Sequence, residues 1–152
     1  MPVIGSVDLI DFPDLSLHNI PCKIDTGAMS SSIHCHRVRI KEVDGKDMLL
    51  VRFLDPKNPQ HIKKDFVFEH FSEKRIKNSF GDAEYRYMVK LKVTLMGQTF
   101  ETEFSLANRK EMNYRVLLGR KLLRKRFLVD VSKKNVSYKN KLIIHGNSNS
   151  IA

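Results

Sequence analysis

The sequence has little of what links small proteins covalently or anchors them in a membrane. Only two of its 152 residues are cysteine, none is tryptophan, and no apolar stretch approaches the roughly 20 residues of a membrane span. Cys22 and Cys35 could form a disulfide, but we expect them to be reduced and to act as small, half-buried hydrophobic side chains. Since 41% of the residues are hydrophobic and 29% are charged, a disordered chain is also excluded. The composition predicts a soluble globular protein.

Length and terminal composition set the expected boundaries. A chain of 152 residues suffices for one hydrophobic core without disulfides or a structural metal. Residues 146–152 are mostly small and polar, so we expect a single domain over residues 1–145 and a flexible C-terminal tail over 146–152. The first eight residues lack the basic and apolar regions of a secretory signal. A cytoplasmic location is therefore the expectation.

Acidic residues are the charged type in short supply. The chain has 17 Asp and Glu against 27 Lys and Arg, and the formal charge of +10 favours nucleic acid, anionic lipid or an acidic protein as a partner. The excess is largest in residues 120–141, where Asp130 is the one acidic residue. A solvated surface that keeps the protein in solution explains this excess equally well.

Helical periodicity is nearly absent, and apolar residues mostly alternate with polar ones. Residues 85–95 alternate in this way, 96–98 have the composition of a turn and 99–106 alternate again, which predicts a long antiparallel hairpin. Asp44-Gly45 is a second turn signal. Further short strands are expected at residues 3–11, 21–25, 33–43, 48–54, 65–70, 115–118, 127–131 and 141–145.

The best helical segment is short. It covers residues 119–125, directly after an apolar strand. Many short strands and one short helix near the C-terminus predict an all-β fold, a closed β-barrel-like lobe. Residues 55–62, with two prolines, are expected to form a loop, and residues 72–82 a hairpin arm or a flexible excursion.

The sharpest local motif is an apolar strand that runs into Asp25-Thr26-Gly27. An aspartic peptidase needs a carboxylate where a strand meets a turn, a glycine that permits the tight turn, and a hydroxyl that fixes the loop. Two such carboxylates about 3 Å apart share one proton, so one acts as a base toward water and the other as an acid toward the carbonyl. The motif occurs once, so the second carboxylate must come from another copy of the chain in a two-fold homodimer. The triplet alone is equally compatible with an ordinary turn.

A later segment, Leu117-Leu118-Gly119-Arg120, ends an apolar strand and starts the short helix, an arrangement that can support the Asp-Thr-Gly turn from behind. Together the two segments resemble those of retropepsin-type aspartic peptidases. More closely, residues 23–32 with His34, then 108–109, 116–120 and 126–130, resemble the RimB-like family. That family is described as ATP-dependent zinc proteases, and its members often accompany a RimK-type ATP-grasp ligase that adds glutamates to proteins. The resemblance extends over residues 3–132, most of the chain.

The resemblance implies roles for individual residues. Retropepsins commonly carry further acidic residues after this motif, whereas here Met29 and three serines follow, so we do not expect the contacts that those acids make. A flap over the site is best placed at residues 75–81. The implied site consists of the catalytic residues Asp25, Thr26 and Gly27, the substrate-binding residues Ala28, Arg75 and Gly81, and the supporting residues Leu117, Leu118, Gly119 and Arg120.

Zinc is the alternative that the family description suggests. His34 and His36 are two residues apart, so both imidazoles would lie on one side of a strand and could share a metal. A catalytic zinc site needs a third protein ligand and a base, and neither a His-Glu-x-x-His nor a His-x-x-Glu-His sequence is present. We therefore expect no cofactor and regard both histidines as weak metal candidates.

Two functions remain compatible with the sequence. The favoured one is a homodimeric, cytoplasmic aspartic endopeptidase, which the resemblance links to protein tails carrying added glutamates and to an ATP-grasp ligase as partner. The rival is a non-catalytic basic β module that binds nucleic acid or an acidic protein, with Asp25 as a plain turn residue. No phosphate-binding Gly-x-x-x-x-Gly-Lys-Ser/Thr loop is present, so any use of ATP would lie in a partner. Neither a membrane nor nucleic acid is the expected partner of the favoured function.

Overall fold

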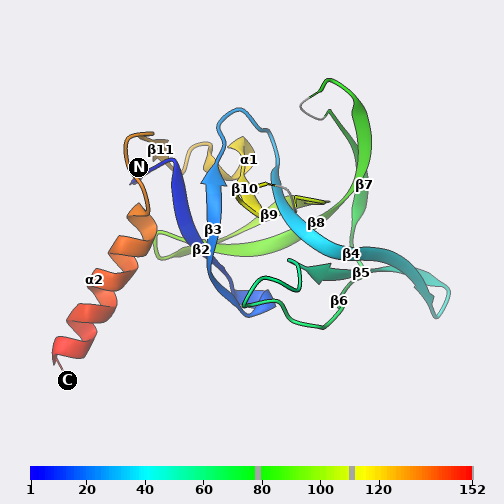
Figure 1. Cartoon of the computed structure of the whole chain (residues 1–152), viewed down its shortest axis with the longest axis horizontal. Helices are drawn as coiled ribbons and strands as arrows, with labels where there is room; N and C mark the ends of the chain where they lie inside the picture. Colours follow the sequence, from blue (N-terminus) through cyan, green and yellow to red (C-terminus); the bar gives the residue numbers. More distant parts are fainter. Residues whose placement is uncertain (78–79, 110–111, 152) are drawn as a thin grey trace.

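Strands make up most of the computed structural model, which describes residues 1–77, 80–109 and 112–151 (Figure 1). The alternating sequence pattern predicts this predominance of strands. In chain order the elements are β1 (Val3–Ile4), β2 (Val7–Phe12), the 3-10 helix η1 (Pro13–Leu15), β3 (Leu17–Ile24), β4 (Ser31–Val43), β5 (Lys46–Phe53), β6 (Phe66–Phe68), β7 (Ser72–Lys77), β8 (Ala83–Leu95), β9 (Gln98–Ala107), β10 (Val116–Leu118), α1 (Arg120–Leu123), β11 (Leu128–Val129) and α2 (Val136–Ile151).

Two hairpins form at the predicted turns. Met96 and Gly97 join β8 to β9, and their φ angles of 54° and 72° place both central residues of the turn in the left-handed region. Asp44 and Gly45 join β4 to β5 in the same way, with φ angles of 53° and 78°. Turns of this kind match the right-handed twist of the flanking strands, so these short loops determine the register of both hairpins.

The pairing of the strands returns on itself. The large sheet runs β10-β3-β2-β8-β9-β4-β5-β6, and β10 also pairs with β4. β7 pairs with β8, and this hairpin projects from one end of the molecule (Figure 1). It is the hairpin arm predicted over residues 72–82, of which 78–79 lie outside the described residues. The strand-dominated fold is confirmed, while closure into a barrel stays a prediction.

Alternate side chains of the strands meet in a hydrophobic core. Burial in β2 alternates residue by residue, so that Ile10 and Phe12 lie inside. Phe12 packs edge to face against Phe104 of β9, with ring centroids 5.5 Å apart. Leu122 and Leu123 of α1 belong to the same cluster. The core therefore holds in place the short helix that the sequence predicts at residues 119–125.

Both cysteines lie in this core. Cys22 and Cys35 are buried and free, so they form no disulfide with each other. Burial raises the pKa of both thiols, and the nearby Asp8 charge raises that of Cys22 further. A thiol that stays protonated is a poor nucleophile, which agrees with the predicted role as small hydrophobic side chains.

The strand prediction for residues 141–145 is wrong. These residues belong to α2, a second helix in addition to the short one predicted near the C-terminus. A short apolar run is ambiguous between strand and helix, and here a remote buried group favours the helix. The Asp8 carboxylate accepts the main-chain N–H groups of Ser137 and Tyr138 at 2.9 and 3.1 Å.

α2 extends away from the sheets and carries the C-terminus at its far end (Figure 1). Within the described part of the chain, no helix is long and apolar enough to cross a membrane. The backbone of α2 continues past residue 145 as far as Ile151. The flexibility of residues 146–152, and the domain boundary at residue 145, stay predictions.

Replacement of Asp8 by alanine is expected to lower the free energy of unfolding by about 1–3 kcal/mol, because two N–H groups at the start of α2 lose their buried acceptor. Urea unfolding measures this loss, and amide exchange at Ser137 and Tyr138 should become faster. Asp47→Ala, at an exposed position in the β4–β5 hairpin, is the matched control. Unchanged exchange at the two amides in Asp8→Ala would contradict the capping role.

Candidate functional site

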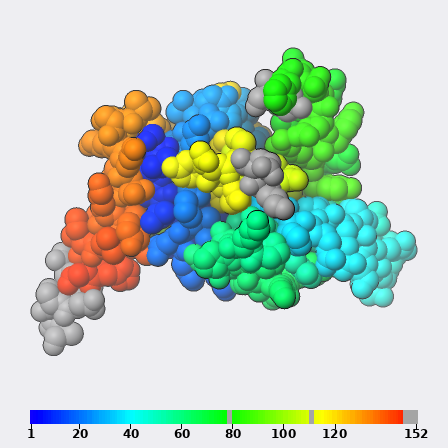
Figure 2. Space-filling view, in the orientation of Figure 1, coloured from blue at the N-terminus to red at the C-terminus, as the bar shows by residue number. Residues whose placement is uncertain are grey.

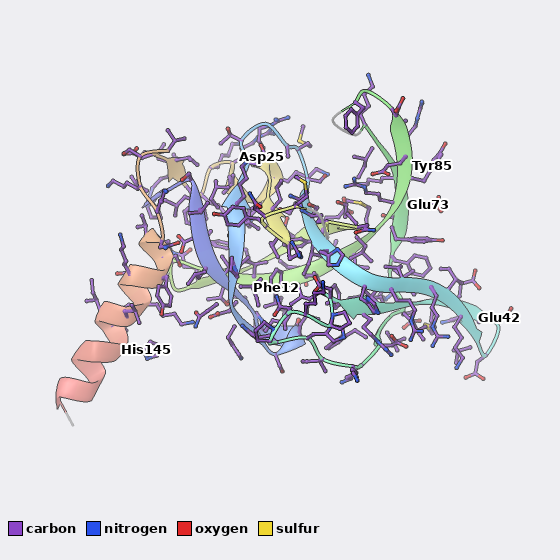
Figure 3. All side chains as sticks on the ribbon, in the orientation of Figure 1. Phe12, Asp25, Glu42, Glu73, Tyr85 and His145 are labelled. Atoms are coloured by element: carbon purple, nitrogen blue, oxygen red, sulfur yellow. The ribbon has the colours of Figure 1, made fainter. Side chains whose placement is uncertain are left out.

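The Asp-Thr-Gly turn begins where β3 ends, and Figure 3 shows Asp25 in the loop beyond that strand. The half-buried Asp25 carboxylate accepts the Gly27 N–H through Oδ1 at 2.8 Å, which fixes its orientation. A Cβ on Gly27 would lie 3.2 Å from that same oxygen, a crowded distance. Thr26 is exposed, and its carbonyl oxygen accepts a hydrogen bond from Nη1 of Arg120 at 3.1 Å. Main-chain geometry and a single arginine thus hold the turn.

The segment from β10 into α1 lies against this turn. β10 runs parallel to β3 with Leu118 opposite Ile24, and the Asp25 N–H donates to the Leu118 carbonyl at 2.8 Å. The Arg120 N–H donates to the Ala28 carbonyl at 2.8 Å. A Cβ on Gly119 would lie 2.6 Å from the Ser30 carbonyl oxygen, so only glycine fits here. The structure therefore brings the two sequence motifs into direct backbone contact, while their functional roles stay proposals.

A cavity of about 570 Å³ lies between this turn and the β7–β8 hairpin. Four of the predicted site residues line it: Gly27, Ala28, Arg75 and Leu117. Gly81 is in the turn of the hairpin with a φ of 83° and is not part of the lining. No acidic residue lines the cavity, whereas six basic ones do: Lys74, Arg75, Lys77, Arg86, Arg109 and Lys121.

Arg109 is a cavity residue that sequence reasoning placed in the family resemblance but not in the site. Its guanidinium is half-buried and donates through Nε to the Tyr114 carbonyl at 3.2 Å. Burial lowers the pKa of Arg109, the Arg86 charge lowers it further, and the Asp25 charge opposes both effects. Among the described residues no carboxylate lies within ion-pair distance of Arg109. Over the described ranges, Arg109 is therefore a desolvated cation that feels the Asp25 charge but forms no ion pair.

The loop that carries Arg109 is held by His34. The Arg109 N–H donates to Nδ1 of the buried His34 ring at 2.8 Å. Nε2 of the ring points toward Oδ2 of Asp55 at 3.7 Å and has no hydrogen-bond partner in the described part of the chain. Burial is the main reason that the pKa of His34 is lowered. The neutral ring, with its proton on Nε2, accepts the Arg109 N–H.

The two histidines of the zinc prediction differ in burial, although both line one cavity of about 380 Å³ together with Asp55. The pairing of β4 with β5 is irregular between Cys35 and Arg37, which breaks the simple alternation. His34 is buried, whereas His36 is exposed and packs against the His61 ring with centroids 5.8 Å apart. Over the described residues, no group of three or more His, Cys, Asp or Glu side chains could hold a metal. The expectation that the chain needs no cofactor stays a prediction.

Asp55 links the two loops behind the cavity. Its carboxylate is 5% exposed and accepts Nε of Arg115 at 3.0 Å and the Lys57 N–H at 3.2 Å. Burial alone would raise the pKa of Asp55, but the hydrogen bonds from Arg115 and Lys57 together with the Arg115 charge outweigh it, so the pKa is lowered. This buried charge supports the loop that positions Arg109.

Known proteins are similar to this chain in sequence and in fold. Residues 3–140 match the model of a family described as retropepsin-like aspartic endopeptidase RimB. A probable alpha-L-glutamate ligase of Shewanella pealeana is 33% identical over 130 residues, which cover 86% of this chain and 28% of that protein. One of Desulfotalea psychrophila is 30% identical over 132 residues, covering 84% of this chain and 28% of that protein. This chain thus spans less than a third of the length of these curated relatives.

A solved structure is similar over nearly its whole length. The crystal structure of Lpg0085 from Legionella pneumophila, a protein of unknown function, superposes with a TM-score of 0.69 at 25% sequence identity. The match covers 90% of this chain and 98% of that one. The same arrangement of strands therefore exists in a chain with a largely different sequence.

Asp55→Asn is expected to lower the free energy of unfolding at neutral pH by about 1–3 kcal/mol, because Arg115 and the Lys57 amide lose a charged acceptor. A lowered carboxyl pKa contributes stability that is present above the unfolded pKa of about 4 and is lost as the pH falls through the folded pKa. Urea unfolding at a series of pH values should therefore show a flatter acid-side decline for the variant. Asp47→Asn is the exposed control, and an Asp55→Asn slope equal to that of the unchanged chain would contradict the network.

Proposed function

Because the chain belongs to the family of RimB-like, retropepsin-like aspartic endopeptidases, we propose that it is an aspartic endopeptidase that works as a homodimer. The observation that carries the proposal is the Asp25 turn. Its carboxylate is fixed by the Gly27 N–H, the turn is supported by Leu118 and Arg120, and it borders a cavity large enough for peptide side chains. A single chain supplies one such carboxylate, so the second comes from the same turn of another copy.

In the proposed reaction the two Asp25 carboxylates share one proton. The ionised one takes a proton from water, and the resulting hydroxide oxygen bonds to the carbonyl carbon of the peptide. The protonated one gives its proton to the carbonyl oxygen. The tetrahedral intermediate then collapses: the carboxyl group that took the water proton gives a proton to the nitrogen as the C–N bond breaks. The other carboxylate takes a proton back from one hydroxyl, whose oxygen becomes the carbonyl oxygen of the product acid. Gly27 and Thr26 keep the carboxylate in position throughout, since they shape its turn.

The charge of the cavity supports an acidic substrate. Lys74 and Lys121 are both close to Glu103, and Arg86 pairs with Glu84. Arg75 and Arg109 have no carboxylate within ion-pair distance among the described residues. Two guanidinium groups in the cavity that pair with no carboxylate among the described residues suit carboxylate side chains of a substrate. Since curated relatives are named probable glutamate ligases, we propose protein tails with added glutamates as substrate and an ATP-grasp ligase as partner.

The rival function, a basic module that binds without cleaving, has an observation of its own. Exposed cations also lie outside the cavity, after α1 and just before and within the first turn of α2: Arg124, Lys125, Lys133, Lys134 and Lys139. A surface of this charge attracts any polyanion, including nucleic acid. Binding alone therefore does not distinguish the two functions, whereas dependence on Asp25 does.

Asp25→Asn is expected to reduce cleavage of a glutamate-rich peptide by about 10²–10⁴-fold, because the amide can neither take nor give the proton. Cleavage is measured by mass spectrometry of the products, and peptide binding by fluorescence anisotropy. Binding should persist in the variant and weaken with added salt. Asp14→Asn, an exposed change in η1, is the matched control and should cleave normally. Binding of the peptide by the unchanged chain with no cleavage would favour the rival, and cleavage that survives Asp25→Asn would rule out Asp25 as the catalytic carboxylate.

A further inference from the structure

A second cavity, of about 600 Å³, lies beside the proposed site and has no role in the proposed reaction. It is bounded by β6 and the segment leading to β7 on one side and by β8 and β9 on the other. Its lining combines apolar side chains, among them Phe68, Phe71 and Met88, with the glutamates Glu69, Glu101 and Glu103.

The register of the hairpin places the two cavities next to each other. Ser72 pairs with Met88, and both line the second cavity. Two residues further along β7, Lys74 pairs with Arg86, and both line the first cavity. Side chains two residues apart lie on the same face of a strand, at a spacing of about 7 Å. The cavities therefore occupy successive positions on one face of the β7–β8 hairpin.

β9 makes the same connection. Ser105 lines the first cavity and Glu103 and Glu101 line the second, and these three alternate residues lie on one face of the strand. Glu103 stands at the boundary, where it forms an ion pair with Lys74 and lies 3.7 Å from Lys121. Glu103 therefore separates two regions of different chemistry.

The second cavity is apolar and acidic where the first is basic. Phe68, Phe71 and Met88 provide apolar surface, and the lining contains three glutamates. Glu69 pairs with Lys46 and Glu103 with Lys74, which leaves Glu101 as the unpaired acid in the described lining. Glu101 is exposed and has no ion pair among the described residues. A run of glutamates that continued from the first cavity into the second would meet like charge and would leave the apolar surface uncovered.

We propose that the two cavities form one groove that reads a junction in the substrate: acidic residues in the first cavity, and apolar or basic residues of the same chain in the second. The proposal rests on the proposed function for the acidic half of the groove. It adds a substrate requirement that a uniform run of glutamates does not meet. An extended peptide gains about 3.3 Å per residue, so a few residues on either side of the junction reach both cavities. The protein thereby distinguishes an acidic tail attached to a body segment from free acidic peptide.

Fluorescence anisotropy tests this with full-length Asp25→Asn chain, in which the peptide is not consumed. The probes are a labelled peptide of glutamates joined to a leader of leucine and lysine, in both orders, and an all-glutamate peptide of the same length. One order of the junction peptide should bind about tenfold more tightly than the all-glutamate peptide, at a salt concentration held constant.

Charge reversal inside the groove should remove the preference. Glu101→Lys places a cation in the second cavity, so the all-glutamate peptide should gain affinity and the junction peptide should lose it. Glu73→Lys, the same change of charge, is the matched control. Glu73, labelled in Figure 3, lies in β7 between Ser72 and Lys74. Each of these two neighbours lines one of the cavities, whereas Glu73 lines neither. The preference should survive in this control.

Equal affinity of the junction and all-glutamate peptides would overturn the groove, as would a preference that Glu101→Lys leaves unchanged. Cleavage by the unchanged chain is scored separately, so the two proposals fail independently. A junction preference without cleavage would retain the groove and reject the peptidase. Cleavage of both peptides with equal affinity would retain the peptidase and reject the groove.

Discussion

The candidate site depends on the close backbone contact between the Asp25 turn and the start of α1. Gly119 has no side chain, so the Ser30 carbonyl can approach to a distance that any Cβ would block. That approach lets the Arg120 N–H reach the Ala28 carbonyl and the Asp25 N–H reach the Leu118 carbonyl. Leu122 then anchors α1 in the core. The orientation of the Asp25 carboxylate thus follows from packing that begins in the centre of the molecule.

Charge is distributed unevenly around this rigid centre. Six basic residues line the cavity, and Glu103 is the acid that lies close to two of them, Lys74 and Lys121. Figure 2 shows the surface of the β7–β8 hairpin in green. Like charges gathered in one place repel one another, so an anion that binds there relieves the repulsion as well as making new contacts. Near His34 the buried charge is instead an acid: the Asp55 carboxylate is buried and pairs with Arg115. The buried network fixes the loop, and Arg75 and Arg109, which form no ion pair among the described residues, remain available for a ligand.

The sequence predicts local features well because each has a local cause. The alternation of apolar and polar residues predicts the strands, and Asp44-Gly45 and Met96-Gly97 predict the two hairpin turns. The backbone contact between the Asp25 turn and the segment around Gly119 agrees with the arrangement expected from the sequence. α2 is missed because its first N–H groups are capped by Asp8, more than a hundred residues earlier in the chain. The different burial of His34 and His36 accompanies an irregularity in strand pairing that has no signal in the sequence. Arg109 becomes a cavity residue only through its tertiary bond to His34.

The central claim is that one catalytic site uses the Asp25 carboxylates of two chains. Unchanged chain and Asp25→Asn chain, refolded together in varying ratio at constant total concentration, test it through cleavage of a glutamate-rich peptide. Mixed dimers carry a single carboxylate, so the account predicts that activity per unchanged chain falls in proportion to the fraction of unchanged chains. Activity per unchanged chain that stays constant at every ratio would contradict the shared site.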